Sequence, residues 1–244
     1  MSSKKVGEYV LEQPIGKGSF SRVFEGRKEG NPERFAIKMI PNLNQNEKPM
    51  MELIEKEIEI LRKIEHPNIV RLIDIKRTKN NYYLVFEYCE KGDLEKYVQR
   101  YYKTGMPERT AQKLMFEMAD AVKTLHEQNI VHRDIKLASR LLTSKFVAKL
   151  SDFGFSKAQE SSSMLMKTYC GTPLTMAPEI HNHFQYDFKC DIWSFGVICY
   201  QLTYNKPPYL PENGGGVQDF IDVIAKSNGV DFPKEPPMNE SFES

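Results

Sequence analysis

The sequence predicts an α+β fold in two lobes, with a small antiparallel sheet first and a mainly helical lobe after it. Residues 9–40 alternate or cluster β-forming side chains between turn signals. Beyond residue 93 the apolar residues recur mainly at steps of three and four, which is the period of an amphipathic helix. Strands that come before the helices, rather than alternating with them, are typical of this class.

The first lobe is expected to span residues 1–86, with a five-stranded antiparallel sheet and one main helix. The first strands lie within residues 9–40, around turns at 16–19 and 29–33. The next helix, over residues 49–65, carries an apolar stripe of Met50, Ile54, Ile58, Leu61 and Ile64. The runs NIVRLIDI and NYYLVFEY, on either side of the polar KRTKN, predict a hairpin that completes the sheet. Residues 87–93 form a hinge to the second lobe.

The second lobe, residues 94–244, is expected to be mainly helical. One helix carries the apolar stripe Ala111, Leu114, Met115, Met118, Val122 and Leu125. The segment DIWSFGVICYQL is apolar on every side, as in a buried helix. The segment DFIDVIAKS predicts one more helix, and the Pro-rich, acidic tail after it shows no core-forming period.

Charge and composition exclude several classes of protein. The formal net charge of +1 gives no strong field for nucleic acid or for an anionic membrane. Every apolar stretch is far shorter than the ~18 residues of a membrane span, and the first residues lack the apolar run of a signal peptide. The four cysteines show no metal-ligand spacing and suit free thiols in a reducing compartment. We therefore expect a cytoplasmic protein with no nucleic-acid partner and no membrane span.

Three features of the first lobe point to chemistry. Gly16 and Gly18 lie between two strand-like runs, where glycines let the backbone approach phosphate oxygens, although such a pattern more often marks a simple turn. Lys38 lies in the strand FAIK, where a half-buried lysine needs a carboxylate or phosphate partner. Glu57 is a candidate partner because it lies on the apolar stripe of its helix, and the alternative is a glutamate at the helix edge in solvent.

Further motifs follow in the second lobe: HRDIK at residues 132–136, DFG at 152–154 and APE at 177–179. With the Gly-rich turn and FAIK they make five signatures in one order and spacing, and through them the chain resembles the eukaryotic protein kinase family over about residues 9–229. Lys136 after HRD and Gly171-Thr172 before APE are the pattern of its Ser/Thr members. DFGFS and GTPLTMAPE resemble the calcium/calmodulin-dependent-kinase-like group and its autophagy-initiating relatives.

The resemblance implies a bilobal protein-kinase-like fold, ATP and Mg²⁺ as cofactors, and protein substrates. By the same resemblance, Lys38 would hold the α- and β-phosphates and pair with Glu57. Asp134 would be the catalytic base that accepts the proton of the substrate hydroxyl, and Lys136 would contact the γ-phosphate.

The nucleotide contacts implied by the resemblance come from three places. The Gly-rich turn would cover the phosphates, and the hinge would offer backbone groups to adenine, with Phe86 guarding the back pocket. Apolar side chains would sandwich the purine, with an acid near the ribose. The residues implied are Ile15, Gly16, Gly18, Val23, Ala36, Glu87, Tyr88, Cys89, Asp93 at the ribose, and Leu141.

Arg133, beside the catalytic aspartate, resembles the class of kinases whose activation loop is ordered by phosphorylation. This implies an activating kinase as a partner, with Thr168 as the favoured acceptor. Ser161, Ser162, Ser163 and Thr172 compete with it, and the alternative is that these hydroxyls only solvate a loop.

The chain departs from the family pattern at the metal. Asp152 would ligate the Mg²⁺ that bridges the phosphates, but the family's second ligand, an asparagine five residues after Asp134, is replaced by Ser139. A serine hydroxyl is shorter and a poorer ligand for Mg²⁺. Arg140 follows where the pattern has an apolar residue, so its guanidinium is expected to reach solvent or an acid.

Two more departures concern length and substrate. The family normally continues for several more helices, including an arginine that pairs with the APE glutamate, so Glu179 is expected to lack this partner and the helical lobe to lack its last helices. That would leave an apolar patch on the DIWSFGVICY helix. Basophilic members place acids where this chain has Ala138 and Gln201, so we expect little selection for arginine in the substrate.

Two functions therefore stay open. The first is a protein Ser/Thr kinase with Lys38, Glu57, Asp134, Lys136 and Asp152 as its working set. The second is a pseudokinase, a nucleotide-binding or scaffolding module of the same fold whose altered loop and short C-terminus mark lost turnover.

Overall fold

The computed structural model describes residues 4–18, 21–41, 48–153, 157–158, 172–182, 184, 186–211 and 217–233. The chain divides into two compact units, Met1–Glu90 and Lys91–Ser244. The division falls within the hinge expected at residues 87–93. Each unit has hydrophobic clusters of its own.

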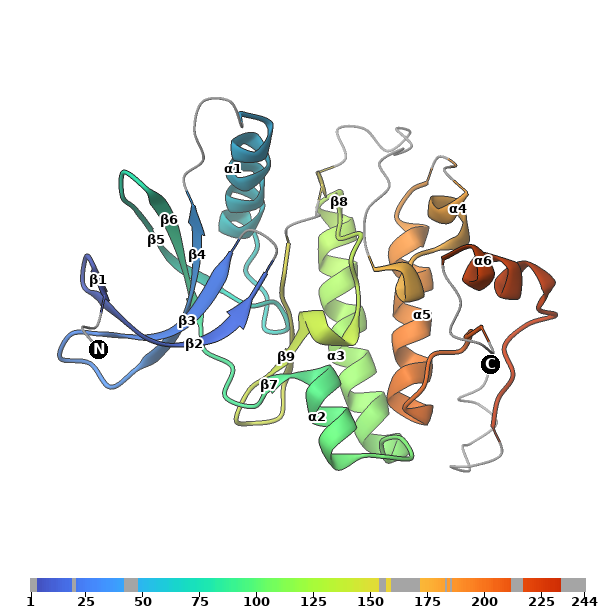
Figure 1. Cartoon of the computed structure of the whole chain (residues 1–244). Coiled ribbons are helices and arrows are strands. Elements are labelled where there is room, and N and C mark those ends of the chain that lie inside the picture. The colour runs from blue at the N-terminus through green and yellow to red at the C-terminus, as the bar shows by residue number, and fades with distance from the viewer. Residues whose placement is uncertain are drawn as a thin grey trace. The chain divides into compact units, whose positions relative to one another are not determined.

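Unit 1 holds an antiparallel sheet in the order β1-β2-β3-β4-β6-β5 with one helix, α1 (Figure 1). The elements are β1 (Lys4–Val6), β2 (Tyr9–Lys17), β3 (Arg22–Lys28), β4 (Arg34–Pro41), α1 (Lys48–Lys63), β5 (Leu72–Arg77) and β6 (Asn81–Glu87). The prediction of five strands is wrong by one, because β1 was missed. Three residues, two of them lysines, carry no strand pattern, yet Val6 is buried and Gly7 makes the turn into β2 with a φ of +57°.

The two faces of this sheet bury different residues, as the two-residue period of a strand requires. Tyr83 and Val85 of β6 pack on one face, and their neighbours Tyr82 and Leu84 pack on the other, against α1. The predicted stripe of α1 is confirmed for its described side chains, since all are at most 8% exposed: Ile54, Ile58, Leu61 and Ile64. This packing fixes α1 opposite β4.

Unit 2 is mainly helical, as predicted, with two small sheets in the orders β10-β9-β7 and β11-β8. Its elements are β7 (Gly92–Asp93), α2 (Leu94–Tyr101), α3 (Glu108–Glu127), β8 (Ile130–Val131), η2 (Leu137–Ser139), β9 (Arg140–Leu142), β10 (Ala148–Leu150), β11 (Lys157–Ala158), η3 (Pro173–Thr175), α4 (Pro178–His181), α5 (Lys189–Tyr204) and α6 (Val217–Lys226).

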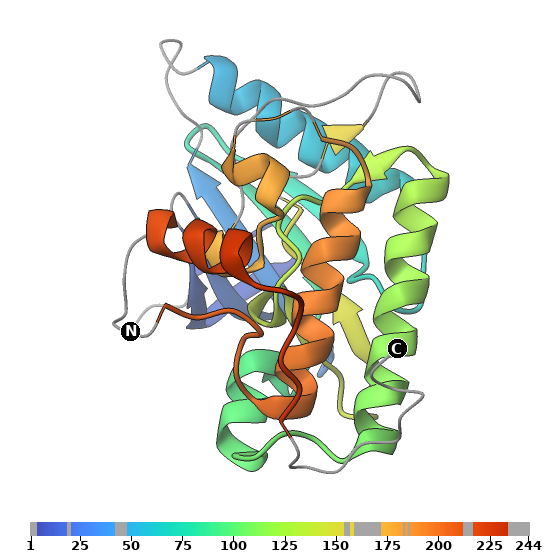
Figure 2. The same ribbon diagram turned by 90° about the vertical axis from the view of Figure 1, so that its right-hand side faces the viewer.

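Helices α3 and α5 pack side by side (Figure 2). The predicted apolar stripe of α3 faces the hydrophobic cluster that also contains Ile198 and Leu202 of α5. The segment just before α3 contacts the last turn of α5: Met106 N donates to Leu202 O at 2.8 Å, and a Cβ on Gly105 would lie 1.6 Å from Thr203 O. Only glycine fits at position 105, where φ is +106°.

One face of α5 is uncovered among the described residues. Ile192 is 55% exposed, so the prediction that this helix is buried on every side is wrong for that face. The face lines a cavity of about 910 Å³ together with aromatic side chains and Glu179. The expected apolar patch on this helix is therefore present.

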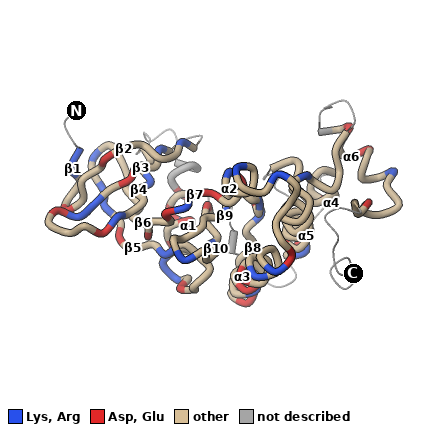
Figure 3. Tube along the Cα trace, turned by 90° about the horizontal axis from the view of Figure 1, so that it is seen from below, with Lys and Arg blue, Asp and Glu red and all other residues tan. Residues whose placement is uncertain are grey.

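Charged residues of both signs are interspersed along the described part of each unit (Figure 3). Within the described ranges, no helix combines the length and the apolar character needed to cross a membrane. No disulfide joins the described cysteines, Cys89, Cys190 and Cys199.

Candidate active site

In unit 1 the predicted lysine and glutamate meet. Lys38 lies in the middle of β4, between Val23 of β3 and Leu84 of β6. Its Nζ donates to Glu57 Oε1 at 2.7 Å, and the two side chains are 18% and 9% exposed. The expected pairing is confirmed, and the alternative of a solvent-exposed Glu57 is excluded. Contact of Lys38 with phosphates stays a prediction.

The Gly-rich segment is partly strand and partly turn. Gly16 lies within β2 opposite Val23, and Gly18 N donates to Ser21 O at 2.9 Å in the turn that follows. A Cβ at Gly18 would lie 2.7 Å from Ser21 Oγ, so this close turn favours glycine. Ile15 is 43% exposed, and residues 19–20 lie outside the described part of the chain.

The residues implied to contact adenine and ribose already have structural contacts. Glu87 N donates to Arg71 O at 3.1 Å, and the Glu87 carboxylate accepts Arg71 N at 2.7 Å. Cys89 is 7% exposed, and Val23 and Ala36 are half-buried.

Asp93 caps helix α2 and accepts Lys96 N at 2.8 Å, while its other oxygen pairs with Lys96 Nζ at 2.6 Å. Leu141 lies opposite Asp93 in the small sheet and is half-buried. Binding of the ribose by Asp93 would compete with this lysine, and it stays a prediction.

A buried aspartate of α5 positions the loop that contains HRD. Asp191 is 0% exposed, and its two oxygens accept the backbone N–H groups of His132 and Arg133, both at 2.8 Å. His126, in the last turn of α3, lies 2.9 Å from the same carboxylate. Arg133 has a φ of +68°, a conformation that these hydrogen bonds stabilise. Asp191 was not among the residues predicted from the sequence, although an acid in an apolar helix is itself a signal, because a buried charge needs partners.

His132 is neutral in this setting. It is fully buried, and this burial is the main cause that lowers its pKa to about 4. The positive charge of Arg140 lowers the pKa further. Its Nδ1 accepts Asp134 N at 3.3 Å, which leaves Nε2 to donate to Ser151 O at 3.3 Å. His132 therefore supports the backbone around Asp134 rather than taking part as a charge.

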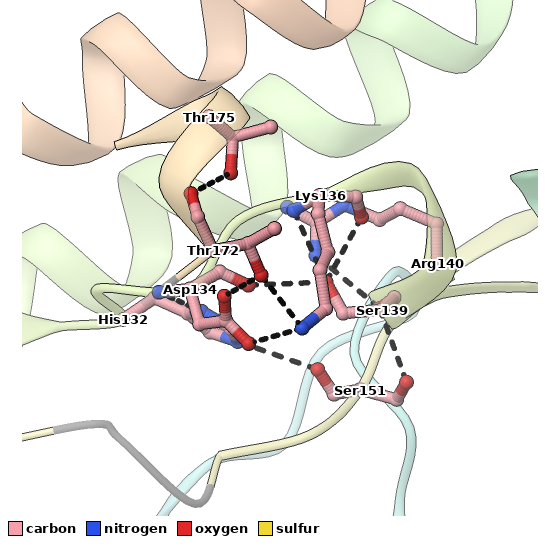
Figure 4. Close-up of polar contacts among 8 residues, drawn as sticks. All are labelled: His132, Asp134, Lys136, Ser139, Arg140, Ser151, Thr172 and Thr175. Carbon is pink, nitrogen blue, oxygen red and sulfur yellow. Dashed lines mark hydrogen bonds and ion pairs between the residues drawn. The ribbon is translucent and has the colours of Figure 1, made fainter. Parts of the chain in front are cut away.

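Asp134, Lys136 and Thr172 form a closed triangle of hydrogen bonds (Figure 4). Lys136 Nζ donates to Asp134 Oδ2 at 2.6 Å and to Thr172 Oγ1 at 2.9 Å. Thr172 Oγ1 donates to Asp134 Oδ1 at 2.7 Å. The Asp134 side chain is 1% exposed and that of Lys136 is 28% exposed. The structure thus brings the predicted base and the predicted phosphate contact together, and adds Thr172.

Ser139 ends the short turn η2 and joins this loop to the next strand. Its hydroxyl lies 2.9 Å from Lys136 O and 3.3 Å from both Asp134 O and Lys136 N. Its carbonyl accepts Ser151 N at 2.9 Å and Ser151 Oγ at 3.0 Å. Ser139 is 2% exposed.

Asp152 differs from Ser139 in its exposure and in its hydrogen bonds. It is exposed, it has a φ of +67°, and its carboxylate makes no hydrogen bond or ion pair with the residues that the structure describes. An exposed carboxylate without partners suits a hard cation such as Mg²⁺. Within the same residues, no group of three or more acidic, histidine or cysteine side chains could hold a metal alone. Any metal here would need further ligands from substrate or water.

Arg140 lies inside unit 2, contrary to the expectation that it reaches solvent or an acid. It is 0% exposed, its Nη1 is 3.4 Å from Ser139 O, and its Nε and Nη2 have no hydrogen-bond partner among the described residues. Burial lowers its pKa, and the charges of Asp191 and Asp134 oppose this shift. The guanidinium was expected to find an acid because a buried charge without a partner is costly.

Several predicted residues cannot be placed. Gly154, residues 161–163, Thr168 and Gly171 lie outside the described residues. Glu179 is described, and its carboxylate has no ion pair or hydrogen bond with the described part of the chain.

Comparison with known proteins identifies the family that these features belong to. The profile of the family described as "Protein kinase domain" matches residues 9–243. Similar curated proteins include serine/threonine-protein kinase ATG1c of Arabidopsis thaliana, 39% identical over 235 residues, and serine/threonine-protein kinase atg1 of Dictyostelium discoideum, 37% identical over 229 residues. Serine/threonine-protein kinase ATG1 of Komagataella pastoris is 31% identical over 272 aligned residues.

These alignments cover 95%, 91% and 96% of this chain but only 31%, 33% and 34% of the relatives, so the chain spans about a third of their length. They favour the autophagy-initiating relatives, one of the two subgroups that the motifs suggested. These relatives carry the name serine/threonine-protein kinase, and the chain belongs to the protein kinase domain family.

Proposed function

We propose that this chain transfers the γ-phosphoryl group of ATP to a serine or threonine hydroxyl of a protein. The observation that carries the proposal is the triangle of Asp134, Lys136 and Thr172, in which a buried carboxylate is held by two donors. A carboxylate fixed in place in this way is positioned to accept a proton from a reacting hydroxyl.

The side chains of this triangle keep unused hydrogen-bond donors and acceptors that a substrate could contact. Among the described residues, each oxygen of Asp134 accepts one hydrogen bond from these two side chains, which leaves a lone pair on each oxygen. Lys136 has three N–H donors, of which two are used, so the third can contact a phosphate oxygen. Because only 1% of the Asp134 side chain is exposed, Lys136 or Thr172 must turn aside when the substrate hydroxyl approaches.

The proposal assigns the remaining roles residue by residue. Lys38, oriented by Glu57, would contact the α- and β-phosphates, and Asp152 would hold Mg²⁺. When bound, Mg²⁺ neutralises charge on the phosphate oxygens. Arg133 would pair with a phosphorylated activation loop, for which Thr168 is the proposed acceptor and a second kinase the proposed activator.

A phosphate-transfer assay tests the proposal directly. Purified protein is given γ-labelled ATP, Mg²⁺ and a general protein substrate, beside the variant Asp134→Asn. Loss of the base should lower turnover about 10²–10⁴-fold. Transfer that is equal in both proteins would contradict the role of Asp134.

The pseudokinase alternative rests on Ser139 and on Arg140, which is buried beside the loop without a carboxylate partner among the described residues. Thermal unfolding with Mg·ATP separates the two functions. A ligand at a hundred times its Kd adds about 2.7 kcal/mol of stability, which is a clear shift in Tm. A shift without phosphate transfer would favour the pseudokinase, and no shift at millimolar Mg·ATP would rule out both nucleotide-dependent functions.

A further inference from the structure

We propose that Ser139 is a positioning residue of the catalytic loop, in place of the metal-ligand role that the family pattern gives to this position. The chain would then hold its metal through one carboxylate, that of Asp152. This inference rests on the proposed function, because the metal is the one that accompanies ATP.

The hydroxyl of Ser139 is already in use. A hydroxyl has one proton and two acceptor lone pairs. The proton is shared between Lys136 O at 2.9 Å and Asp134 O at 3.3 Å, and one lone pair faces Lys136 N at 3.3 Å. At most one lone pair remains, on a residue that is 2% exposed.

A magnesium ion would have to open the loop to use that lone pair. It needs a ligand oxygen at about 2.0–2.1 Å in nearly ideal octahedral geometry. Ser139 N also donates to Lys136 O at 3.1 Å, so moving the hydroxyl outward would disturb the turn η2 as well. Asp152 is exposed and unpartnered among the described residues, so it offers a charged oxygen without any such loss.

The bonds of Ser139 explain what the residue does instead (Figure 4). Its hydroxyl contacts the backbone of Asp134 and Lys136, and its carbonyl accepts both Ser151 N and Ser151 Oγ. Ser151 directly precedes Asp152. Ser139 therefore connects the segment that carries the proposed base to the segment that carries the proposed metal ligand.

The first test needs no ligand. Ser139→Ala should lower Tm by about 2–4 °C, because it removes the hydrogen bonds that the buried hydroxyl makes to Lys136 N, Lys136 O and Asp134 O. Ser227→Ala is the matched control: its hydroxyl also donates to the carbonyl three residues earlier, Ile224 O at 2.8 Å, but from a half-buried position that water can reach. That change should lower Tm by less than about 1 °C. Equal shifts in the two variants would overturn the positioning role.

The second test counts metal ions. Mn²⁺ replaces Mg²⁺, a non-hydrolysable ATP analogue is added, and electron paramagnetic resonance measures the bound Mn²⁺. We expect one ion per chain in the wild type and in Ser139→Ala, and a second ion in Ser139→Asn. Two ions in the wild type that fall to one in Ser139→Ala, or a single ion in Ser139→Asn, would overturn the inference.

Failure of the proposed function would look different. No nucleotide-dependent Mn²⁺ in any of the three proteins would contradict ATP binding itself and, with it, a metal at Asp152. The unfolding comparison would still decide whether Ser139 positions the loop.

Discussion

Lys38 in unit 1 and Arg140 in unit 2 are both cations on a central strand of a sheet, β4 and β9 respectively. Lys38 has a carboxylate oxygen at 2.7 Å and keeps 18% of its side chain exposed. Arg140 is 0% exposed, and two of its three nitrogens have no partner among the described residues.

The difference teaches that position in a sheet does not decide what a charge contributes. A paired charge can be held in the interior, whereas a buried charge without a carboxylate bound to it costs several kcal/mol, because the charges of Asp191 and Asp134 offset the desolvation of Arg140 only in part. The ion pair of Lys38 should therefore hold β4 and α1 together in unit 1, whereas Arg140 should lower the stability of unit 2.

The largest effect should come from making Lys38 resemble Arg140. Glu57→Leu leaves Lys38 without its acid and should lower the free energy of unfolding by about 3 kcal/mol, the low end for a broken buried pair, since Lys38 is partly exposed. Urea unfolding measures this change. The double variant Lys38→Met with Glu57→Leu should recover most of the loss.

Glu59→Leu is the control for that experiment, because Glu59 lies on the exposed side of the same helix. It should change the stability by less than about 0.5 kcal/mol. If Glu57→Leu is no more harmful than Glu59→Leu, the ion pair does not stabilise unit 1.

A second effect of similar size concerns pH and His132. The pKa of His132 is lowered to about 4 in the folded chain, so between pH 6.5 and 4 the unfolded chain binds more protons. Stability should therefore fall as the pH is lowered through this window, by about 1.4 kcal/mol per unit at most. Urea unfolding of wild type and His132→Gln at pH 7, 6 and 5 measures the contribution. Equal slopes in the two proteins would show that His132 does not titrate as its burial requires.

Much of unit 1 could be read from sequence because its signals are local. Lys38 and Glu57 both stand in periodic segments, so their faces follow from the periods of strand and helix. The strand β1 was missed, since its pairing with β2 comes from Val6 packing on the core and not from any pattern in KKV.

The catalytic loop was harder to read. Its motif named Asp134 and Lys136, but Asp191 and Thr172 reach the loop from segments 36 or more residues away, which no local pattern reveals. Arg140 was expected at the surface or in an ion pair because sequence shows a charge but not the space around it.

The third prediction makes Arg140 apolar. Arg140→Met keeps a long, flexible side chain and removes the charge, so it should raise the free energy of unfolding by about 1–3 kcal/mol. Arg140→Lys keeps the charge and should bring no such gain. Thermal and urea unfolding of the three proteins make the comparison, and a clear loss of stability in Arg140→Met would mean that the guanidinium has a stabilising partner.

The smallest effect extends the comparison to a cation that the substrate supplies. Ala138 is exposed in the catalytic loop and Gln201 is half-buried in α5, so neither position offers the carboxylate that an arginine of a peptide substrate would need. The acid Asp93 is held by Lys96, which competes for it. An arginine two or three residues before the acceptor should therefore change kcat/KM less than about fivefold, which is under 1 kcal/mol. A peptide array that pairs each arginine peptide with its alanine counterpart measures this ratio.

Ala138→Glu and Gln201→Glu should each raise the arginine preference, because a carboxylate and a guanidinium can then form a bidentate pair. Strong selection for arginine by the wild type would contradict this prediction. It would mean that an acid elsewhere in the chain pairs with the arginine of the substrate.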